Sequence, residues 1–365
     1  MRIIGGWLTW TENVPINNNW PLVIFLLLTA LVIFWCWRRG RRHKRWYFWP
    51  LPLILPCLLL IGGALLNTHF GLYVRLGDLF DQYPFPTTSA RALSATSGNY
   101  PQGVTAVTTI PGSQSGVGPH TAFVWLPPQY FKEPTSKFPV VYLVPGTPGT
   151  PSDWSTGGNV PQTGLANARA GRPAVIVSVS AGSNQLEDTE CVNGSQGNWQ
   201  TYLSEDVPNY INGNARVLQG PKNQAFAGLS MGGFCAQITT LRNPSRFGIF
   251  GNFSGTTLPT YNDGLPALFG DQPNLTQTIN SYRSDWIIAN QPQSRTVVGQ
   301  VITGAQDSAG LLADEKQFVA KAQSLGMNVT MSTPPGEHTF YLWASALQTW
   351  LPWALEQMGK PTPVK

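Results

Sequence analysis

Charge is scarce in this sequence: Asp, Glu, Lys and Arg make up only 11% of its 365 residues, against about a quarter in ordinary soluble domains. Part of the deficit comes from two uncharged runs near the N-terminus, Trp20–Trp37 and Trp46–Leu66. Each is about as long as a helix that crosses a bilayer. Tryptophans gather at the ends of both runs, as they do at membrane interfaces. Prolines at positions 50, 52 and 56 predict that the second helix is kinked or shortened. We therefore expect a transmembrane hairpin over residues 20–66.

A basic octamer, RRGRRHKR, separates the two apolar runs at residues 38–45 and holds six Lys or Arg. Short basic loops stay in the cytoplasm, so both flanks, residues 1–19 and everything after Leu66, are expected outside the cell membrane. A cleaved signal peptide fits poorly because the charges follow the first apolar run. Nucleic-acid binding is rejected because the octamer is confined between two membrane spans. The net charge of +5 therefore reports topology and not an acidic partner.

Only four cysteines are present, and two of them, Cys36 and Cys57, lie in the apolar runs. Cys191 and Cys235 remain for the large outer part, where an oxidising compartment favours a disulfide between them. Loops after neighbouring parallel strands meet at one sheet edge, where the helix that carries Cys235 also begins. Two buried free thiols are the alternative. A metal site is disfavoured because neither cysteine has a C-x-x-C or nearby histidine companion.

Residues 101–358 alternate predicted strands with predicted helices, which is typical of one α/β domain with a doubly wound, mostly parallel sheet. A Pro-, Ser- and Thr-rich connector, residues 67–100, precedes this domain, and a short C-terminal tail, residues 359–365, follows it. The strands that we expect are Val104–Ile110, Thr121–Leu126, Val140–Val144, Ala174–Val177, Gln224–Gly228, Ile249–Phe253, Thr296–Thr303 and Asn328–Thr333. The helices that we expect are Trp199–Asn212, Met231–Asn243, Leu311–Ser324 and Thr339–Gln357.

Ser230 stands in a small, glycine-rich segment, AFAGLSMGGFC, between a predicted strand and a predicted helix. This is the setting of a nucleophile elbow, in which a strained turn presents the serine and small neighbours let strand and helix approach closely. The helix N-terminus would also place the Met231 amide where an oxyanion develops. The pattern predicts a nucleophile, while a chance G-x-S-x-G match in a glycine-rich chain is the inert alternative.

A serine nucleophile needs a base, and only one of the four histidines follows Ser230 in the chain: His338, before the C-terminal helix. His120, which precedes a strand, is expected on the surface. Asp307, directly after the penultimate strand, is the candidate for the carboxylate that orients the imidazole. The order serine, aspartate, histidine is that of α/β-hydrolases. The competing carboxylates are Asp314 and Glu315, expected to be solvated helix residues, and Glu337.

The loop after the strand VVYLV reads PGTPGTPSDW, residues 145–154. A second oxyanion donor is expected here, and prolines leave few amides, so the Thr147 N–H is predicted to act beside that of Met231. A phosphate-binding loop is the rival interpretation. It fails because no Gly-Lys-Ser/Thr follows the glycines.

Several segments of residues 100–358, among them LVPGTPGTPSDW, AFAGLSMGGFCA and GEHTFYLW, resemble the putative-esterase branch of α/β-hydrolases. That branch includes S-formylglutathione hydrolase-like esterases and the secreted mycolyltransferases of actinobacterial envelopes. The resemblance puts Ser230, Asp307 and His338 on the triad positions and implies acyl-enzyme chemistry with no cofactor and no metal. Two features depart from it. Pro145 stands where esterases often have histidine, and mycolyltransferases usually carry a glutamate as triad acid and a simple secretion signal.

Together these features predict a membrane-anchored, extracytoplasmic serine esterase or acyltransferase. Scarce charge and abundant Trp, Phe and Pro favour lipid or cell-envelope ester substrates. Mycolyltransferase-like transfer to a sugar is one alternative. A catalytically inactive hydrolase fold that serves as an envelope scaffold or binding module is the other. Protein partners and oligomeric state stay open.

Overall fold

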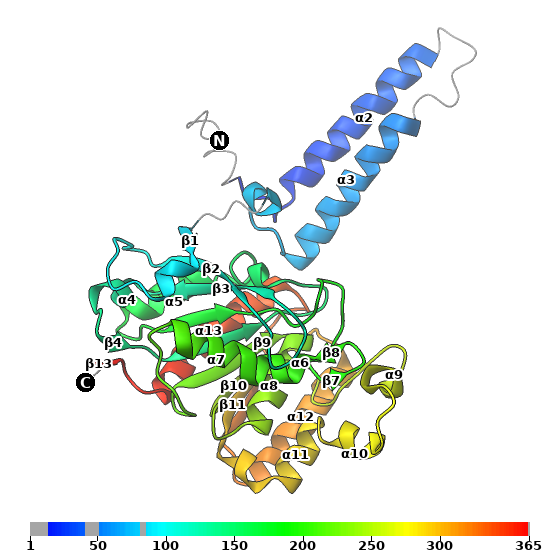
Figure 1. Ribbon diagram of the computed structural model, residues 1–365. Coiled ribbons are helices and arrows are strands. Elements are labelled where there is room, and N and C mark those ends of the chain that lie inside the picture. The colour runs from blue at the N-terminus through cyan, green and yellow to red at the C-terminus, as the bar shows by residue number, and fades with distance from the viewer. Residues whose placement is uncertain (1–13, 41–50, 81–84, 364–365) are drawn as a thin grey trace. The chain divides into compact units, whose positions relative to one another are not determined.

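The computed structural model describes residues 14–40, 51–80 and 85–363 (Figure 1). The chain forms two compact units. The first comprises the described residues before Phe85 together with Thr339–Tyr341, and the second comprises Phe85–His338 and the described residues from Leu342 onward.

The first unit is built on two long apolar helices, α2 (Trp20–Gly40) and α3 (Leu51–Phe70), which pack side by side (Figure 1). Their apolar stretches, Trp20–Arg39 and Pro52–Phe70, have mean hydropathies of 2.3 and 1.8 and are long and apolar enough to cross a membrane. A helix of this length rises about 30 Å, the thickness of the hydrocarbon core. Residues 41–45 of the predicted basic loop lie outside the described residues.

Hydrogen bonds close the open end of the hairpin. The Asn67 side chain accepts from the Tyr73 amide (2.8 Å) and donates to the Ile16 carbonyl (3.1 Å). Pro15 forms an isolated antiparallel bridge with Arg75, just before the short helix η1 (Leu76–Phe80). These contacts tie the segments before α2 and after α3 to each other.

The second unit is organised around a nine-stranded sheet in the order β1-β2-β3-β6-β5-β9-β10-β11-β12. All pairs are parallel except those that β3 makes with β2 and β6. The strands are β1 Thr87–Ser89, β2 Val104–Ile110, β3 His120–Leu126, β5 Val140–Val144, β6 Val175–Ser178, β9 Gln224–Leu229, β10 Ile249–Phe253, β11 Val298–Ile302 and β12 Val329–Ser332. All eight predicted strands are present, with ends within two residues of those expected.

The central strands β5, β9 and β10 are buried along their whole length, which is why their sequences read as short apolar runs. On one face Tyr142 stacks on Phe226, with ring centroids 4.8 Å apart, in a cluster that includes Trp199 and Tyr202. Trp350 contacts Phe253 and donates from its indole to the Phe250 carbonyl (3.1 Å). Helices therefore cover both faces of the sheet, as a doubly wound fold requires.

Helices connect and cover the strands (Figure 1). They are α4 Pro128–Lys132, α5 Val160–Arg169, α6 Trp199–Thr201, α7 Val207–Asn214, α8 Met231–Arg242, α9 Leu265–Phe269, α10 Leu275–Asn280, α11 Ser284–Asn290, α12 Ala309–Ser324 and α13 Phe340–Gln357. A π-helical turn, Tyr202–Asp206, joins α6 to α7. Short pieces complete the unit: η2 Ala90–Leu93, η3 Pro151–Trp154, η5 Pro292–Thr296, and the small sheets β4 Ser136–Lys137 with β13 Thr362–Pro363 and β7 Asn193–Gly194 with β8 Gly197–Asn198.

The structure adds elements that sequence patterns miss. β1 lies within the expected connector 67–100 and pairs with β2, so the sheet begins before residue 101. The helices α5 and α9–α11 were not expected either, because all but α5 are shorter than eight residues and none shows a long apolar period. The predicted limits of the hairpin, catalytic region and tail remain predictions.

Candidate active site

Ser230 occupies a sharp turn between β9 and α8. Its backbone has φ 53° and ψ −127°, a conformation that is unfavourable for a residue with a side chain and is found where surrounding structure imposes it. The Ser230 amide donates to the Phe253 carbonyl on the neighbouring strand (2.8 Å), and its carbonyl accepts from the Gly233 amide (2.9 Å). The turn therefore holds the serine at the carboxyl edge of the sheet.

Two glycines make this turn possible. A Cβ atom on Gly228 would lie 2.0 Å from the Gly232 carbonyl oxygen. A Cβ atom on Gly232 would lie 2.3 Å from the carbonyl oxygens of Val144 and Pro145, on the strand and loop beside it. Any larger residue at either position would push α8 away from β9 and β5, because backbone atoms cannot yield at such distances.

His338 joins Ser230 to Asp307 through two hydrogen bonds. Its Nδ1 lies 2.9 Å from Asp307 Oδ2, and its Nε2 lies 2.9 Å from Ser230 Oγ. The carboxylate can only accept, so Nδ1 carries the proton and Nε2 accepts from the serine hydroxyl. The Asp307 side chain is 6% exposed and that of His338 is 40% exposed. The carboxylate is thus shielded from water, while the imidazole can meet a substrate.

The loops that carry Asp307 and His338 are joined by backbone hydrogen bonds. The Ala305 amide donates to the Pro334 carbonyl (2.8 Å), and the Gln306 amide donates to the Gly336 carbonyl (3.0 Å). The Trp343 ring packs edge-on against the imidazole of His338, with centroids 4.9 Å apart. The two hydrogen bonds join the loops after β11 and β12, which carry Asp307 and His338.

The competing carboxylates lie elsewhere. Asp314 and Glu337 are exposed. Glu315, which we expected to be solvated, is completely buried and accepts from the Thr303 hydroxyl (2.7 Å). That expectation was wrong because Glu315 lies on the inner face of α12, one turn and a half beyond its start. Burial raises its pKa to about 8, and the nearby charges of Asp307 and Asp314 add to the rise.

The segments that carry the two amides expected to form an oxyanion hole meet at the serine. Met231 is the first residue of α8, and the Thr147 hydroxyl contacts its sulfur at 3.1 Å. A Cβ on Gly146 would lie 3.1 Å from the Cβ of Ser230, so the loop after β5 passes directly against the serine. Among the described residues, neither amide donates to a protein acceptor. Neither amide is therefore engaged elsewhere, as an oxyanion donor requires.

Comparison with known proteins agrees with this geometry. A family model described as Putative esterase matches residues 113–356. The chain belongs to the putative esterase family of α/β-hydrolases.

Individual relatives share different parts of the chain. An uncharacterized protein of Corynebacterium glutamicum is 28% identical over 94% of this chain and 84% of its own length. The MPT51/MPB51 antigen of Mycobacterium tuberculosis is 30% identical over 33% of this chain and 38% of the antigen. A solved ferulic acid esterase superposes with a TM-score of 0.61 at 23% identity, covering 70% of this chain and 99% of that chain. The last likeness shows the α/β-hydrolase fold.

A disulfide between Cys191 and Cys235 links the loop after β6 to the helix that begins at the serine. Both cysteines are fully buried. Glu190 and Cys191 have φ values of 46° and 48°, so this loop follows a left-handed path into the bridge. Cys36 and Cys57, by contrast, are free. The bridge ties a loop at the sheet edge to the second turn of α8.

A network of buried polar side chains connects α8 to β10 and α11. Asn252 on β10 donates to the Gln237 side chain on α8 (2.9 Å) and accepts from the Gly255 amide (2.7 Å). Gln237 in turn donates to the Ser284 hydroxyl (2.8 Å). The sequence pattern did not identify Asn252, because a single asparagine within an apolar strand signals nothing about its partner.

His120 is not the surface residue that we expected. Its ring is half-buried and packs on Trp199, with centroids 4.8 Å apart, and its Nε2 donates to the Val117 carbonyl (3.2 Å). Across residues 14–40, 51–80 and 85–363, no three His, Cys, Asp or Glu side chains form a group that could hold a metal ion.

The buried carboxyl of Glu315 predicts a pH-dependent loss of stability. Its folded-state pKa of about 8 exceeds the ordinary value of 4.5, so its contribution is complete below pH 4.5 and is lost as the pH rises through 8. Glu315→Gln keeps an acceptor for Thr303 but cannot ionise. We expect its melting temperature to gain on that of the parent between pH 5 and pH 9. Asp263→Asn, at an exposed position that does not contribute to the pKa of Glu315, is the control. A constant difference between the melting temperatures of the parent and of Glu315→Gln across this pH range would contradict the prediction.

The disulfide predicts equal losses from either cysteine. It closes a segment with a sequence separation of 44 residues, for which the chain-entropy model gives about 4 kcal/mol. We expect Cys191→Ser and Cys235→Ser to lower the free energy of unfolding similarly, and the double variant to lose no more than either single one. Denaturant titration measures this, with Cys57→Ser as a control that leaves the second unit unchanged. Additive losses would show that each cysteine acts by packing alone.

Proposed function

We propose that this protein is a serine esterase or acyltransferase that works through an acyl-enzyme on Ser230. One observation carries the proposal: a single imidazole is hydrogen-bonded at 2.9 Å both to the serine hydroxyl and to a shielded aspartate. A serine that serves only a structural role in a turn does not require hydrogen bonds to a histidine that is itself paired with an aspartate. Membership of the putative esterase family supports the same chemistry.

The proposed reaction uses each residue in a definite role. Ser230 Oγ attacks the acyl carbon while its proton passes to His338 Nε2. Asp307 holds the imidazole and stabilises its positive charge. The Met231 and Thr147 amides stabilise the oxyanion. When the tetrahedral intermediate collapses, the bond to the alcohol oxygen breaks and that oxygen takes the proton from His338.

The acyl group then leaves by the reverse path. Water activated by His338 would complete an esterase cycle, and a sugar hydroxyl would complete a mycolyltransferase-like transfer. Lipid or cell-envelope esters are the substrates we propose, because charge is scarce in the chain. An inactive scaffold of the same fold would keep the turn without needing the serine–histidine–aspartate pairing, so we rank it last.

We further propose that the catalytic unit faces the outside of the cell membrane, anchored by α2 and α3. Two helices long and apolar enough to span, a basic segment after the first, and a disulfide in the second unit support this topology. Such an anchor would tether the second unit to the membrane.

Labelling with a fluorophosphonate probe tests the nucleophile. We expect the parent to be labelled on Ser230 and Ser230→Ala to be unlabelled, with hydrolysis of a p-nitrophenyl ester falling by several orders of magnitude because triad members act as a unit. Ser324→Ala, an exposed helix serine, is the matched control and should label fully. Labelling that persists in Ser230→Ala would transfer the role to another residue.

The same hydrolysis assay distinguishes Asp307 from the competing carboxylates as the candidate triad acid. Asp307→Asn should leave the fold intact and lower kcat on the order of 10⁴-fold, since the imidazole loses the tautomer that accepts the serine proton. Glu315→Gln and Glu337→Gln should retain most of the activity. Near-normal kcat in Asp307→Asn would rule out its role as triad acid.

Protease added to intact cells tests the topology. With both ends outside, the second unit should be digested without permeabilisation, while an epitope inserted within the basic segment at residues 38–45 should be protected. A cytoplasmic reporter protein that stays intact controls for lysis. Digestion of the second unit only after permeabilisation would reverse the orientation.

A further inference from the structure

Glu190 is a buried carboxyl that the proposed reaction does not use. It lies in the loop after β6, directly before Cys191, and is only 3% exposed. Its backbone φ of 46° is left-handed, a conformation that surrounding contacts must impose on a residue with a side chain. Its Oε1 accepts from the Thr260 hydroxyl (2.9 Å), whereas its Oε2 has no partner among the described residues. Burying a carboxyl with one oxygen unpaired is costly, and the contacts around Glu190 indicate what it contributes.

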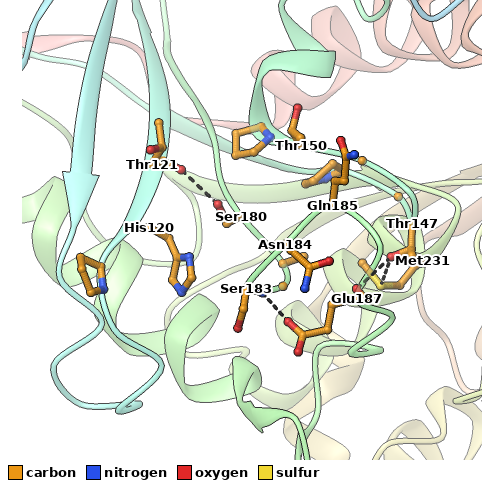
Figure 2. A pocket seen from close by; sticks show the side chains of 17 residues that line it. His120, Thr121, Thr147, Thr150, Ser180, Ser183, Asn184, Gln185, Glu187 and Met231 are labelled. Carbon is orange, nitrogen blue, oxygen red and sulfur yellow. Dashed lines mark hydrogen bonds between the residues drawn. The ribbon is translucent and has the colours of Figure 1, made fainter.

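The loop after β6 is bonded to the proposed oxyanion loop. The Thr147 hydroxyl lies 3.3 Å from the Glu187 carbonyl oxygen and 3.1 Å from the Met231 sulfur, as Figure 2 shows. The Gly149 amide donates to the Gln185 carbonyl (2.8 Å). A displacement of the loop after β6 would therefore reach the loop that carries the Thr147 amide.

The same two loops line a pocket of about 250 Å³ (Figure 2). His120, at the start of β3, lines it as well. The two loops are not packed tightly against each other across this space, so the hydrogen bonds between them help to set their separation.

Glu190 also joins its loop to the segment after β10, to which Thr260 belongs. That segment passes against the nucleophile, because a Cβ atom on Gly255 would lie 2.6 Å from the Ser230 carbonyl oxygen. The residue after Glu190 forms the disulfide with α8. The loop after β6 thus connects the oxyanion loop, the nucleophile helix and the segment after β10.

No Lys, Arg or His of the described residues forms a salt bridge with the Glu190 carboxyl. The charge that acts on it is the negative charge of Asp188, while Thr260 faces it from the segment after β10 with uncharged donors. The bridged cysteines beside it do not titrate. Burial, and then the charge of Asp188, raise the pKa of Glu190 to about 8. Because this exceeds the ordinary value of 4.5, the stabilising contribution of Glu190 is complete below pH 4.5 and is lost as the pH rises through 8.

We propose that Glu190 is a positioning residue for the reaction at Ser230, because its protonated carboxyl holds the loop after β6 and, through it, the loop that carries Thr147. The inference rests on the proposed acyl-enzyme function. Glu190 itself touches neither the substrate nor the reacting atoms. When its carboxyl loses the proton, a second buried negative charge appears beside Asp188, and the loop moves so that this charge reaches water. The oxyanion donor on the neighbouring loop is displaced with it, so acyl transfer slows.

The pH dependence of p-nitrophenyl butyrate hydrolysis by the full chain in detergent tests this proposal. As Glu190 ionises, kcat of the parent should fall about tenfold between pH 7 and pH 9.5 with little change in KM, since an oxyanion donor acts in the transition state. Glu190→Gln keeps an acceptor for Thr260 but cannot ionise, so its kcat should fall less than about twofold over the same range. Glu133→Gln, at an exposed position, is the matched control and should follow the parent.

Asp188→Asn provides a readout that a packing role would not move. Removing the like charge favours ionised Glu190 and lowers its pKa, so the alkaline fall in kcat should begin at a lower pH than in the parent. Glu315→Gln removes the other buried carboxyl whose pKa is raised to about 8, and it should keep the alkaline fall of the parent. An alkaline fall that persists in Glu190→Gln, or that disappears in Glu315→Gln instead, would overturn the proposal.

Hydrogen exchange tests the same coupling without catalysis. Protection of the Gly149 amide, corrected for the intrinsic exchange rate, should decrease between pH 7 and pH 9.5 in the parent and stay constant in Glu190→Gln. If the parent hydrolyses no ester at any pH, the proposed function fails, and the exchange data still decide whether Glu190 holds the two loops. Equal protection of the parent at both pH values would show that it does not. Melting temperatures above the assay temperature at pH 9.5 exclude global unfolding as the cause of a lower kcat.

Discussion

The close approach of β9, α8 and β5 around Ser230 is the constraint on which the site depends. Three backbone segments meet there at distances that exclude a side chain at Gly228 and Gly232. The resulting turn holds the serine in a conformation that a free chain would avoid. The buried strands and the hydrogen bonds of Asn252 surround this turn and impose its conformation. The rest of the site is arranged around this turn.

Asp307 and His338 reach Ser230 because parallel strands end at the same edge of the sheet. The loops after β11 and β12 come from neighbouring strands and bond to each other through Ala305 and Gln306. The histidine is therefore positioned by its own loop and by the loop of its aspartate. The disulfide at Cys191 restrains a third loop against the nucleophile helix. Three loops, those after β6, β11 and β12, are thus restrained around the turn at Ser230. The loops after β11 and β12 are hydrogen-bonded to each other, and the loop after β6 is linked to α8 by the disulfide.

Burial divides the carboxyl groups by role. Glu315 and Glu190 are almost fully buried, and burial raises the pKa of each to about 8. Asp307 is also shielded, but it faces an imidazole that can take a positive charge. Asp307 is hydrogen-bonded to the His338 ring, whereas Glu315 and Glu190 are each bonded to a threonine hydroxyl and burial favours their neutral acid forms. The environment, not the residue type, separates them.

Much of this protein could be predicted from its sequence. Apolar runs such as Val140–Val144 identified the central strands because those strands are buried on both faces. The spacing around Ser230 and the scarcity of histidines identified the candidate nucleophile and base, because the chemistry permits few residue types. The order of serine, aspartate and histidine along the chain then indicated the fold.

Tertiary structure decided what local patterns do not encode. That Glu315 is buried, that His120 lines a pocket, and that Asn252 supports α8 all depend on which elements pack together. β1 was missed because three residues carry no period of their own and gain their hydrogen bonds only from β2. The sequence by itself identified the buried central strands and the candidate nucleophile and base, because burial and acyl-transfer chemistry each permit few residue types. The fold alone determined their neighbours, because contacts between residues far apart in the chain leave no local signal.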